Sequence, residues 1–265
     1  MSFRKAPEQK GSDRSGLQKA LDAALGRRDA DKDAMPLDMI SSSEVERFSK
    51  LPLRMEVTDL IDEIDALLAR GVSIDTIYVD LLAPAARQLG KFWEEDQCDF
   101  VDVTMGLWRL QEVLHEISAR SDFRPNLLEA GANRALFLPM PGDQHFLGPQ
   151  VLDDFFARAG WDTVVMIKPL RKELLDLLST ESFDVVGLTL SRDCPSAAVR
   201  NIIKAMRSVS CNEHISILVG GLMINQNPAI VTEVGADGTG TDARSALEVA
   251  EALVRSSKVR AQTLR

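Results

Sequence analysis

The sequence predicts an α/β protein in which a helical bundle precedes a doubly wound, five-stranded parallel sheet. Three observations predict this fold. Long amphipathic stretches fill the first part of the chain, short runs rich in β-branched residues alternate with helical patterns in the second part, and a turn-rich segment at 121–133 separates them. Alternating strands and helices favour a parallel sheet with helices on both faces.

We predict that residues 1–42 form a flexible, loosely attached arm. The segment is polar, except that Leu17, Leu21 and Leu25 fall on one helical face behind a capping-box pattern formed by Ser15 and Gln18. Two interpretations stay open. A solvated extension with transient helix is favoured over a helix that docks on a partner.

We predict that residues 43–122 form the helical bundle. Ser43 and Glu46 match the capping-box pattern that begins a helix. Three amphipathic stretches follow, at residues 53–70, 74–95 and 99–120. Because the connections between them are short, we expect antiparallel neighbours.

We predict that residues 131–258 form the α/β domain. Strands are expected at 134–139, 163–167, 184–190, 215–219 and 235–238. Helices are expected at 149–160, 170–180, 195–209, 225–234 and 242–257. Sheets of this kind bind ligands beyond the carboxyl ends of their strands, so the loop after the first strand is the first place to look for a site.

Charge and composition exclude several classes of function. The chain has 265 residues and carries 31 basic against 40 acidic side chains, a formal net charge of −9. The excess of acidic over basic side chains is concentrated in residues 51–125. An acidic surface repels phosphate, so we expect no direct specific binding to DNA. The longest apolar stretch, at 215–224, is too short to cross a membrane, and the N-terminus lacks an apolar signal core. Three cysteines without metal spacing complete the expectation of a cytoplasmic protein.

The loop after the first strand contains a histidine with a carboxylate beside it. His145 follows Asp143 by two residues and precedes Gly148 by three. A carboxylate that accepts the Nδ1 proton makes the other ring nitrogen a better metal ligand, and a glycine leaves space for a bulky group. From these residues alone, a histidine satisfied within its loop stays the favoured interpretation over a metal ligand. The loop lacks the glycine patterns of dinucleotide and triphosphate sites.

Asp143-x-His145-x-x-Gly148 resembles the D-x-H-x-x-G signature of Rossmann-like or flavodoxin-like cobalamin-binding domains. Further signatures agree with that family in the same order along the chain. They are Thr189-x-Ser191 after the third strand, Gly220-Gly221 after the fourth, Gly235-Ala-Asp237 at the last turn, and Leu82 to Trp93 in the bundle, which resembles the cap over the corrin.

The resemblance implies that cobalamin is the cofactor and that His145 is the lower ligand of its cobalt, oriented by Asp143. It leaves the upper ligand open. The cofactor contacts that it implies are Asp143, Gln144, His145, Gly148, Thr189, Ser191, Gly220, Gly221 and, on the cap, Trp93. Thr189 and Ser191 depart from the family's serine and leucine.

Within this family the chain resembles the AerR/PpaA group of antirepressors in the cap stretch from Trp93 to Gln111 and in the loop from Gly142 to Gly148. It departs from adenosylcobalamin photoreceptors of the repressor type, which carry Glu-His where Val103 and Thr104 stand here. The resemblance implies a protein that is not an enzyme, that responds to light or redox state, and that acts on a PpsR/CrtJ-type transcriptional repressor of photosynthesis genes. No membrane partner is implied. The alternative is a corrinoid methyl-carrier protein of a methyltransferase system.

Two further predictions concern single side chains. Trp108 is expected in the bundle core, because it shares a helical face with Val101 and Met105. The cysteines are expected to be buried or incidental and not redox-active, and Cys194, which precedes Pro195 at a helix start, is the one whose thiolate such a position could favour.

Overall fold

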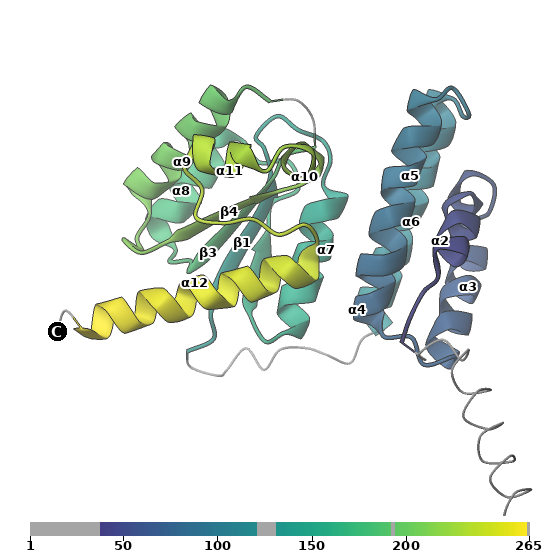
Figure 1. Ribbon diagram of the computed structural model, residues 1–265, viewed down its shortest axis with the longest axis horizontal. Coiled ribbons are helices and arrows are strands. Elements are labelled where there is room, and N and C mark those ends of the chain that lie inside the picture. Colours follow the sequence, from purple (N-terminus) through teal and green to yellow (C-terminus); the bar gives the residue numbers. More distant parts are fainter. Residues whose placement is uncertain (1–37, 121–130, 192–193, 264–265) are drawn as a thin grey trace, which may run out of the picture. The chain divides into compact units, whose positions relative to one another are not determined.

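The computed structural model describes residues 38–120, 131–191 and 194–263 (Figure 1). It comprises a short unit, Met1–Met39, and a compact unit, Ile40–Arg265. The helix predicted in the arm, with Ser15 and Gln18, and most of the predicted linker lie outside the described residues. The boundaries predicted at 42, 122 and 131 stay predictions.

Helices alone make up the first part of the compact unit. They are α2 (Ser42–Ser49), η1 (Leu51–Leu53), α3 (Val57–Ala69), α4 (Ile74–Thr76), η2 (Ile77–Leu82), α5 (Ala83–Glu94) and α6 (Phe100–Arg120). Figure 1 shows α5 and α6 running beside each other, as the short connection predicts. One buried apolar cluster holds these helices together, and Leu60, Leu89 and Leu110 are among its fully buried members.

The first helix of the bundle is capped at Ser41, two residues before the predicted cap, so the Ser43/Glu46 capping box is wrong. Ser41 is the N-cap residue, and its Oγ accepts a hydrogen bond from the Glu44 N–H at 3.3 Å. The Glu44 carboxylate in turn accepts the Ser41 N–H at 2.8 Å and also pairs with Arg70, the C-cap residue of α3. Both serines match the same local pattern, and the contact with Arg70 distinguishes the two.

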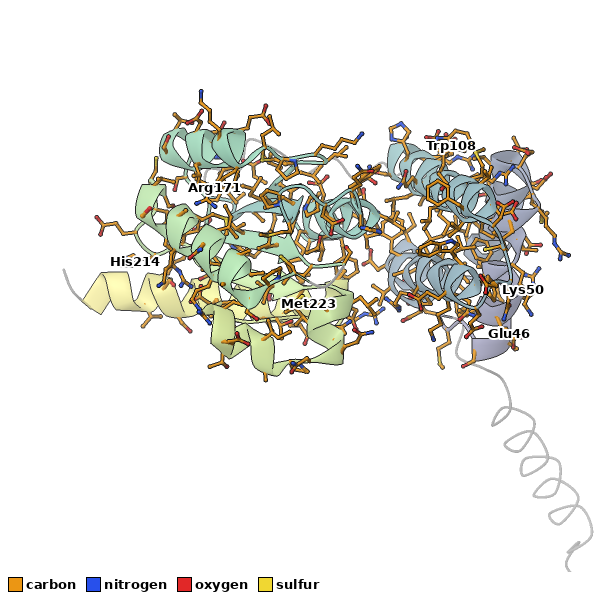
Figure 2. All side chains as sticks on the ribbon, turned by 90° about the horizontal axis from the view of Figure 1, so that it is seen from above. Glu46, Lys50, Trp108, Arg171, His214 and Met223 are labelled. Atoms are coloured by element: carbon orange, nitrogen blue, oxygen red, sulfur yellow. The ribbon has the colours of Figure 1, made fainter. Side chains whose placement is uncertain are left out.

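Glu46 has a different partner from the one that a capping box would give it. Its carboxylate lies 3.1 Å from the Lys50 ammonium group one helical turn later, and Figure 2 labels both residues. An exposed ion pair of this kind contributes about 0.3–0.5 kcal/mol to stability.

The stretch predicted as one helix at 74–95 is continuous but not uniform. Residues Ile77–Leu82 form a π-helical turn, in which the Ala83 N–H donates to the Tyr78 carbonyl five residues earlier. Pro84 explains the insertion, because proline has no N–H and its ring would collide with the carbonyl four residues before it. A π-turn absorbs that conflict without ending the helix.

Among the described residues, four strands form one parallel sheet in the order β2-β1-β3-β4. They are β1 (Arg134–Pro139), β2 (Asp162–Val165), β3 (Val185–Thr189) and β4 (Ser216–Gly220). The helices around them are α7 (Leu147–Arg158), α8 (Arg171–Thr180), α9 (Ser196–Val209), α10 (Leu222–Gln226), α11 (Ala229–Val234) and α12 (Ala243–Thr263). One buried cluster joins the sheet to α8, α9, α10 and α11, and another joins it to α7 and α12 (Figure 1). The sheet is therefore doubly wound, as predicted.

The predicted fifth strand is reduced, in the described part of the chain, to a single parallel bridge between Leu218 and Gly238. Asp237 explains why pairing stops there. Its carboxylate accepts the Ile217 N–H at 2.6 Å, and Gly235 adopts a positive φ of 76° just before it. Aspartate and glycine are poor strand formers, so the segment turns away after two backbone hydrogen bonds, from the Asp237 N–H to the Ile217 carbonyl and from the Val219 N–H to the Gly238 carbonyl.

The strands that matter for a site end level with one another. Pro139 of β1 is the register partner of Thr189 of β3, and Thr189 is the partner of Gly220 of β4. The loops after these three strands therefore leave from the same edge of the sheet, the carboxyl edge. With this strand order, the chain reverses its direction of winding between β1 and β3, the switch point at which such sheets bind ligands.

Helix α7 belongs to both parts of the compact unit. Val151 and Phe155 pack in the bundle cluster, while Phe156 packs against the sheet. Polar contacts accompany this packing, since the Arg158 guanidinium donates to the Asp75 carboxylate of α4 at 2.8 Å.

Among the residues that the structure describes, every helix is too short or too polar to span a membrane.

Candidate functional site

The loop after β1 holds His145 in a fixed orientation. Gly142 turns the chain with φ 92°, and the Asp143 N–H donates to the Met140 carbonyl at 2.8 Å. Asp143 Oδ1 then accepts the His145 backbone N–H at 3.1 Å and lies 2.5 Å from His145 Nδ1. The carboxylate thus holds both the backbone and the ring of the histidine.

The electrostatics of this pair favour one tautomer. Burial raises the pKa of Asp143, but hydrogen bonds from the side chain and backbone of His145 outweigh it and leave the pKa below its usual value. The carboxylate is therefore ionised near neutral pH and accepts a proton on Nδ1. That arrangement leaves the lone pair of Nε2 available to a metal. The imidazole is 43% exposed, whereas the Asp143 side chain is 10% exposed.

A hollow opens beside this loop at the carboxyl edge of the sheet. Its volume is about 320 Å³. The residues that line it are Met140, Pro141, Gly142, Asp143, Gln144, Leu190 and Cys194. The structure therefore brings the predicted residues Asp143 and Gln144 together with the loop after β3.

Thr189, at the end of β3, has a buried hydroxyl whose hydrogen-bonding capacity is unused. The residue is 6% exposed, and its Oγ1 has no hydrogen-bond partner among the described residues. An unsatisfied buried hydroxyl costs about 1–3 kcal/mol. A methyl group added at Gly148 would lie 3.8 Å from Thr189 Cγ2, so Gly148 keeps the space next to this side chain open.

The two glycines after β4 have different structural roles. Gly221 adopts φ 98°, and a Cβ there would lie 2.6 Å from the Leu190 carbonyl oxygen, so packing between the loops after β3 and β4 requires a glycine. At Gly220 a Cβ would meet only the Gly240 carbonyl, at 3.5 Å. Gly220 is therefore the position where a side chain would occupy otherwise open space. Ser191 lies at the same edge and is half-buried.

Thr239 is not among the site residues that the sequence predicts, because Gly238-Thr239-Gly240 after the last strand is interpreted as a turn. Its hydroxyl is buried and has no hydrogen-bond partner in the described part of the chain. It lies between Gly238, which bridges to β4, and Gly240, whose carbonyl is next to Gly220. The Gly238-x-Gly240 spacing after the last strand is the signal that could have drawn attention to it.

The thiolate that the sequence left open as an option at Cys194 is wrong. Burial raises the pKa of this thiol, and the negative charge of Asp143 raises it further. Cys194 is a protonated thiol that lines the hollow.

The core position predicted for Trp108 is also wrong. Trp108 is 45% exposed, and its neighbours on the same helical face, Val101 and Met105, are exposed as well. The buried face of α6 instead carries Val103 and Leu110. Trp93, predicted as a cofactor contact, is 50% exposed in the last turn of α5.

A cluster of three or more histidine, cysteine, aspartate or glutamate side chains suited to a metal ion is not found within the described residues.

Comparisons with known proteins agree with the fold. No protein-family model matches the sequence. The chain is 27% identical over 173 residues to a protein of Rhodobacter capsulatus described as an uncharacterized 20.5 kDa protein in the bchF-crtJ intergenic region. The match covers 65% of this chain and 89% of that protein.

Among solved structures, the chain is similar to the monomethylamine corrinoid protein of Methanosarcina barkeri, with a TM-score of 0.61 and 16% identity over 79% of this chain and 96% of that one. This likeness shows a shared fold, a helical part followed by a Rossmann-like parallel sheet. A cobalamin-binding protein from Desulfitobacterium hafniense DCB-2 matches with 14% identity and a TM-score of 0.42, covering 79% of this chain and 98% of that one. The methanol:cobalamin methyltransferase complex MtaBC of Methanosarcina barkeri matches with 15% identity and a TM-score of 0.43, covering 93% and 94%.

Proposed function

We propose that this protein binds cobalamin through His145 and acts as a light-responsive antirepressor of a PpsR/CrtJ-type repressor of photosynthesis genes. The observation that carries the cofactor assignment is the geometry of His145 and Asp143. One imidazole nitrogen is held by an ionised carboxylate, and the other is available at the switch point of the sheet. A single imidazole supplies one coordination position, which suits a metal already held by a macrocycle.

The residues around the loop fit the nucleotide tail of cobalamin. That tail ends in an aromatic base with a ring nitrogen. The buried Thr189 hydroxyl, which lacks a partner among the described residues, can donate a hydrogen bond to such a nitrogen. Gly148 and Gly220 leave open space for a ring next to the backbone. The unsatisfied hydroxyl is the observation that tests the fit, because a protein without a ligand gains nothing from burying it.

The regulatory role draws its support from the relative and from charge. The similar Rhodobacter capsulatus protein is encoded between bchF and crtJ. The net charge of −9 favours action through another protein over direct contact with DNA. When bound, cobalamin would supply a cobalt centre whose upper ligand changes with light or redox state. The protein itself would contribute binding and presentation of a surface, so we propose that it is not an enzyme.

The test is to load the full chain with cobalamin and record its absorption spectrum before and after illumination. We expect a light-dependent spectral change, together with a light-dependent change in co-elution with a PpsR/CrtJ-type repressor on size-exclusion chromatography. A spectrum and an elution profile that are both unaffected by light would contradict the antirepressor role.

The second candidate is a corrinoid methyl carrier, favoured by the shared fold with the monomethylamine corrinoid protein. Both roles use the same contacts at His145, so the site cannot distinguish them. A methyl-transfer assay distinguishes the two roles. The protein is loaded with methylcobalamin and mixed with a methyltransferase and a thiol acceptor, and the methylation of the thiol is measured. Rapid methyl transfer in the dark, without any effect of light on protein partners, would support the carrier.

A further inference from the structure

The outer face of α6 is apolar where a surface helix is normally polar. Val101, Met105 and Trp108 are 65%, 39% and 45% exposed. Their spacing of four and three residues places them on one side of the helix. We call these three residues the α6 face, and Figure 2 labels Trp108 on it.

The α6 face is not needed to complete the core of the bundle. The opposite side of α6 is already buried, through Val103, Leu110 and Val113. Of the ten large apolar side chains that are exposed in the described part of the chain, four lie on α6, between Phe100 and Trp108. Single exposed apolar residues are ordinary, whereas a cluster marks an interaction site.

Acidic side chains are concentrated at the end of α5, in the connection to α6 and in the first turn of α6. Five exposed carboxylates lie between residues 94 and 102, and they belong to Glu94, Glu95, Asp96, Asp99 and Asp102. None of the five forms an ion pair with a lysine or arginine within the described residues. Asp99 and Asp102 hydrogen-bond to each other's backbone N–H groups at the start of α6, so they stay at this end of the face.

We propose that the α6 face is a docking surface for an amphipathic helix of a partner protein, with lysine or arginine residues beside its apolar side. An apolar stripe on a helix packs well against the apolar stripe of a second helix. The carboxylates select for basic residues beside that stripe and speed the encounter.

Charge argues against the other occupants of an apolar surface. Nucleic acid and anionic lipid would be repelled by the five carboxylates. A second copy of this chain would bring the same carboxylates against themselves. The proposal goes beyond the proposed function, and it does not require light or a particular upper ligand on cobalt.

The test uses the full chain, loaded with cobalamin and kept in the dark. The probe is a fluorescent synthetic peptide of leucine and lysine, about 18 residues long, which forms about five turns of amphipathic helix. A matched peptide carries glutamate in place of lysine. We expect fluorescence anisotropy to show binding of the lysine peptide, with an affinity at least about tenfold above that of the glutamate peptide.

Variants then locate the binding site. The double variant Met105→Ser/Trp108→Ser should weaken lysine-peptide binding by about tenfold or more, because truncating an aromatic anchor removes most of its contact. Leu170→Ser is the matched control, because Leu170 is 64% exposed and lies at the start of α8, outside the α6 face. This variant should leave peptide binding unchanged. The double variant Glu94→Gln/Glu95→Gln should reduce both the affinity and its dependence on salt.

Circular dichroism and the cobalamin absorption of each variant are recorded on the same samples. Equal binding of both peptides, or wild-type binding by Met105→Ser/Trp108→Ser, would overturn the proposal. So would loss of cobalamin absorption in that variant with peptide affinity unchanged, because the face would then contact the cofactor. A failed light response with these peptide results intact would remove the antirepressor role and leave the docking surface.

Discussion

The carboxyl edge of the sheet and the α6 face depart from ordinary protein surfaces in opposite ways. The edge buries a hydroxyl, on Thr189, without a hydrogen-bond partner among the described residues. The α6 face leaves Met105 and Trp108 exposed to water. A hidden polar group suits a small ligand that brings a hydrogen-bonding atom, and an exposed apolar helix face suits a macromolecule that brings apolar area.

The comparison also shows how differently the two regions are prepared. In the loop after β1, Asp143 holds the ring and the backbone of His145, so a ligand would meet an oriented group. On α6 the exposed side chains project from a regular helix, and their spacing alone defines the surface. The first region specifies chemistry, whereas the second specifies shape and charge.

The largest expected effect separates the regions directly. His145→Ala should weaken cobalamin binding by more than about 100-fold, since removing a group that only orients a ligand already costs 10–100-fold. The absorption of any cobalamin that stays bound should shift to a form without an imidazole ligand. Trp108→Ser, on the other region, should leave titration and spectrum unchanged. If His145→Ala has the cobalamin affinity and absorption spectrum of the wild type, His145 is not the metal ligand.

The two glycine positions at the edge should give opposite results. Gly221→Ala should destabilise the fold by about 1–3 kcal/mol, because a positive φ and the Leu190 carbonyl both oppose a side chain. Gly148→Ala should leave the melting temperature close to wild type, since its Cβ meets only ordinary contact, but should lower cobalamin affinity. Thermal unfolding and cobalamin titration measure both quantities. Equal melting temperatures for the two variants would contradict this distinction.

Removing the buried hydroxyl should stabilise the free protein and weaken ligand binding. Thr189→Val replaces the hydroxyl with a methyl group of similar volume, so the cobalamin-free protein should gain about 1 kcal/mol of unfolding free energy. Cobalamin affinity should fall about tenfold, since a hydrogen bond to the ligand is lost. Denaturant unfolding with and without cobalamin measures both. If Thr189→Val destabilises the free protein, the hydroxyl has a protein partner and the assigned role fails.

A satisfied polar group in the bundle should behave in the opposite way. Hydrogen bonding to Arg70, and then to the Ser41 backbone, lowers the pKa of Glu44 from 4.5 to about 2. Because the folded pKa is below the unfolded one, this stabilisation is present above pH 4.5 and is lost as the pH falls toward 2. We expect about 1 kcal/mol after allowance for solvent screening.

Glu44→Gln should therefore destabilise the protein at neutral pH and flatten the loss of stability in acid. Urea unfolding measured across that pH range tests the prediction, with Glu46→Gln as the control on the exposed side of the same helix. Parallel acid profiles for wild type and Glu44→Gln would show that the Arg70 contact contributes nothing.

Much of the fold could be predicted from local pattern. The bounds of β1 match the prediction at 134–139, and the strand order places the Asp143 and His145 loop at the switch point as expected. Each of these features depends on residues close together in the chain, where hydrophobic period and turn residues decide the outcome. The Asp143 and His145 contact is equally local, because two residues separate the partners.

The features that only the tertiary structure decided all involve partners distant in sequence. Ser41 and Ser43 offer equal caps, and the helix start follows from Arg70. Both sides of α6 carry apolar residues, so the period alone could not show which side is buried. The fifth strand ends at a contact between the Asp237 carboxylate and the Ile217 N–H. The Thr189 hydroxyl is unsatisfied only because the fold buries it, with Gly148 at the start of α7 next to its side chain. Local sequence defines which elements can form, and long-range contacts choose among the alternatives that it leaves equal.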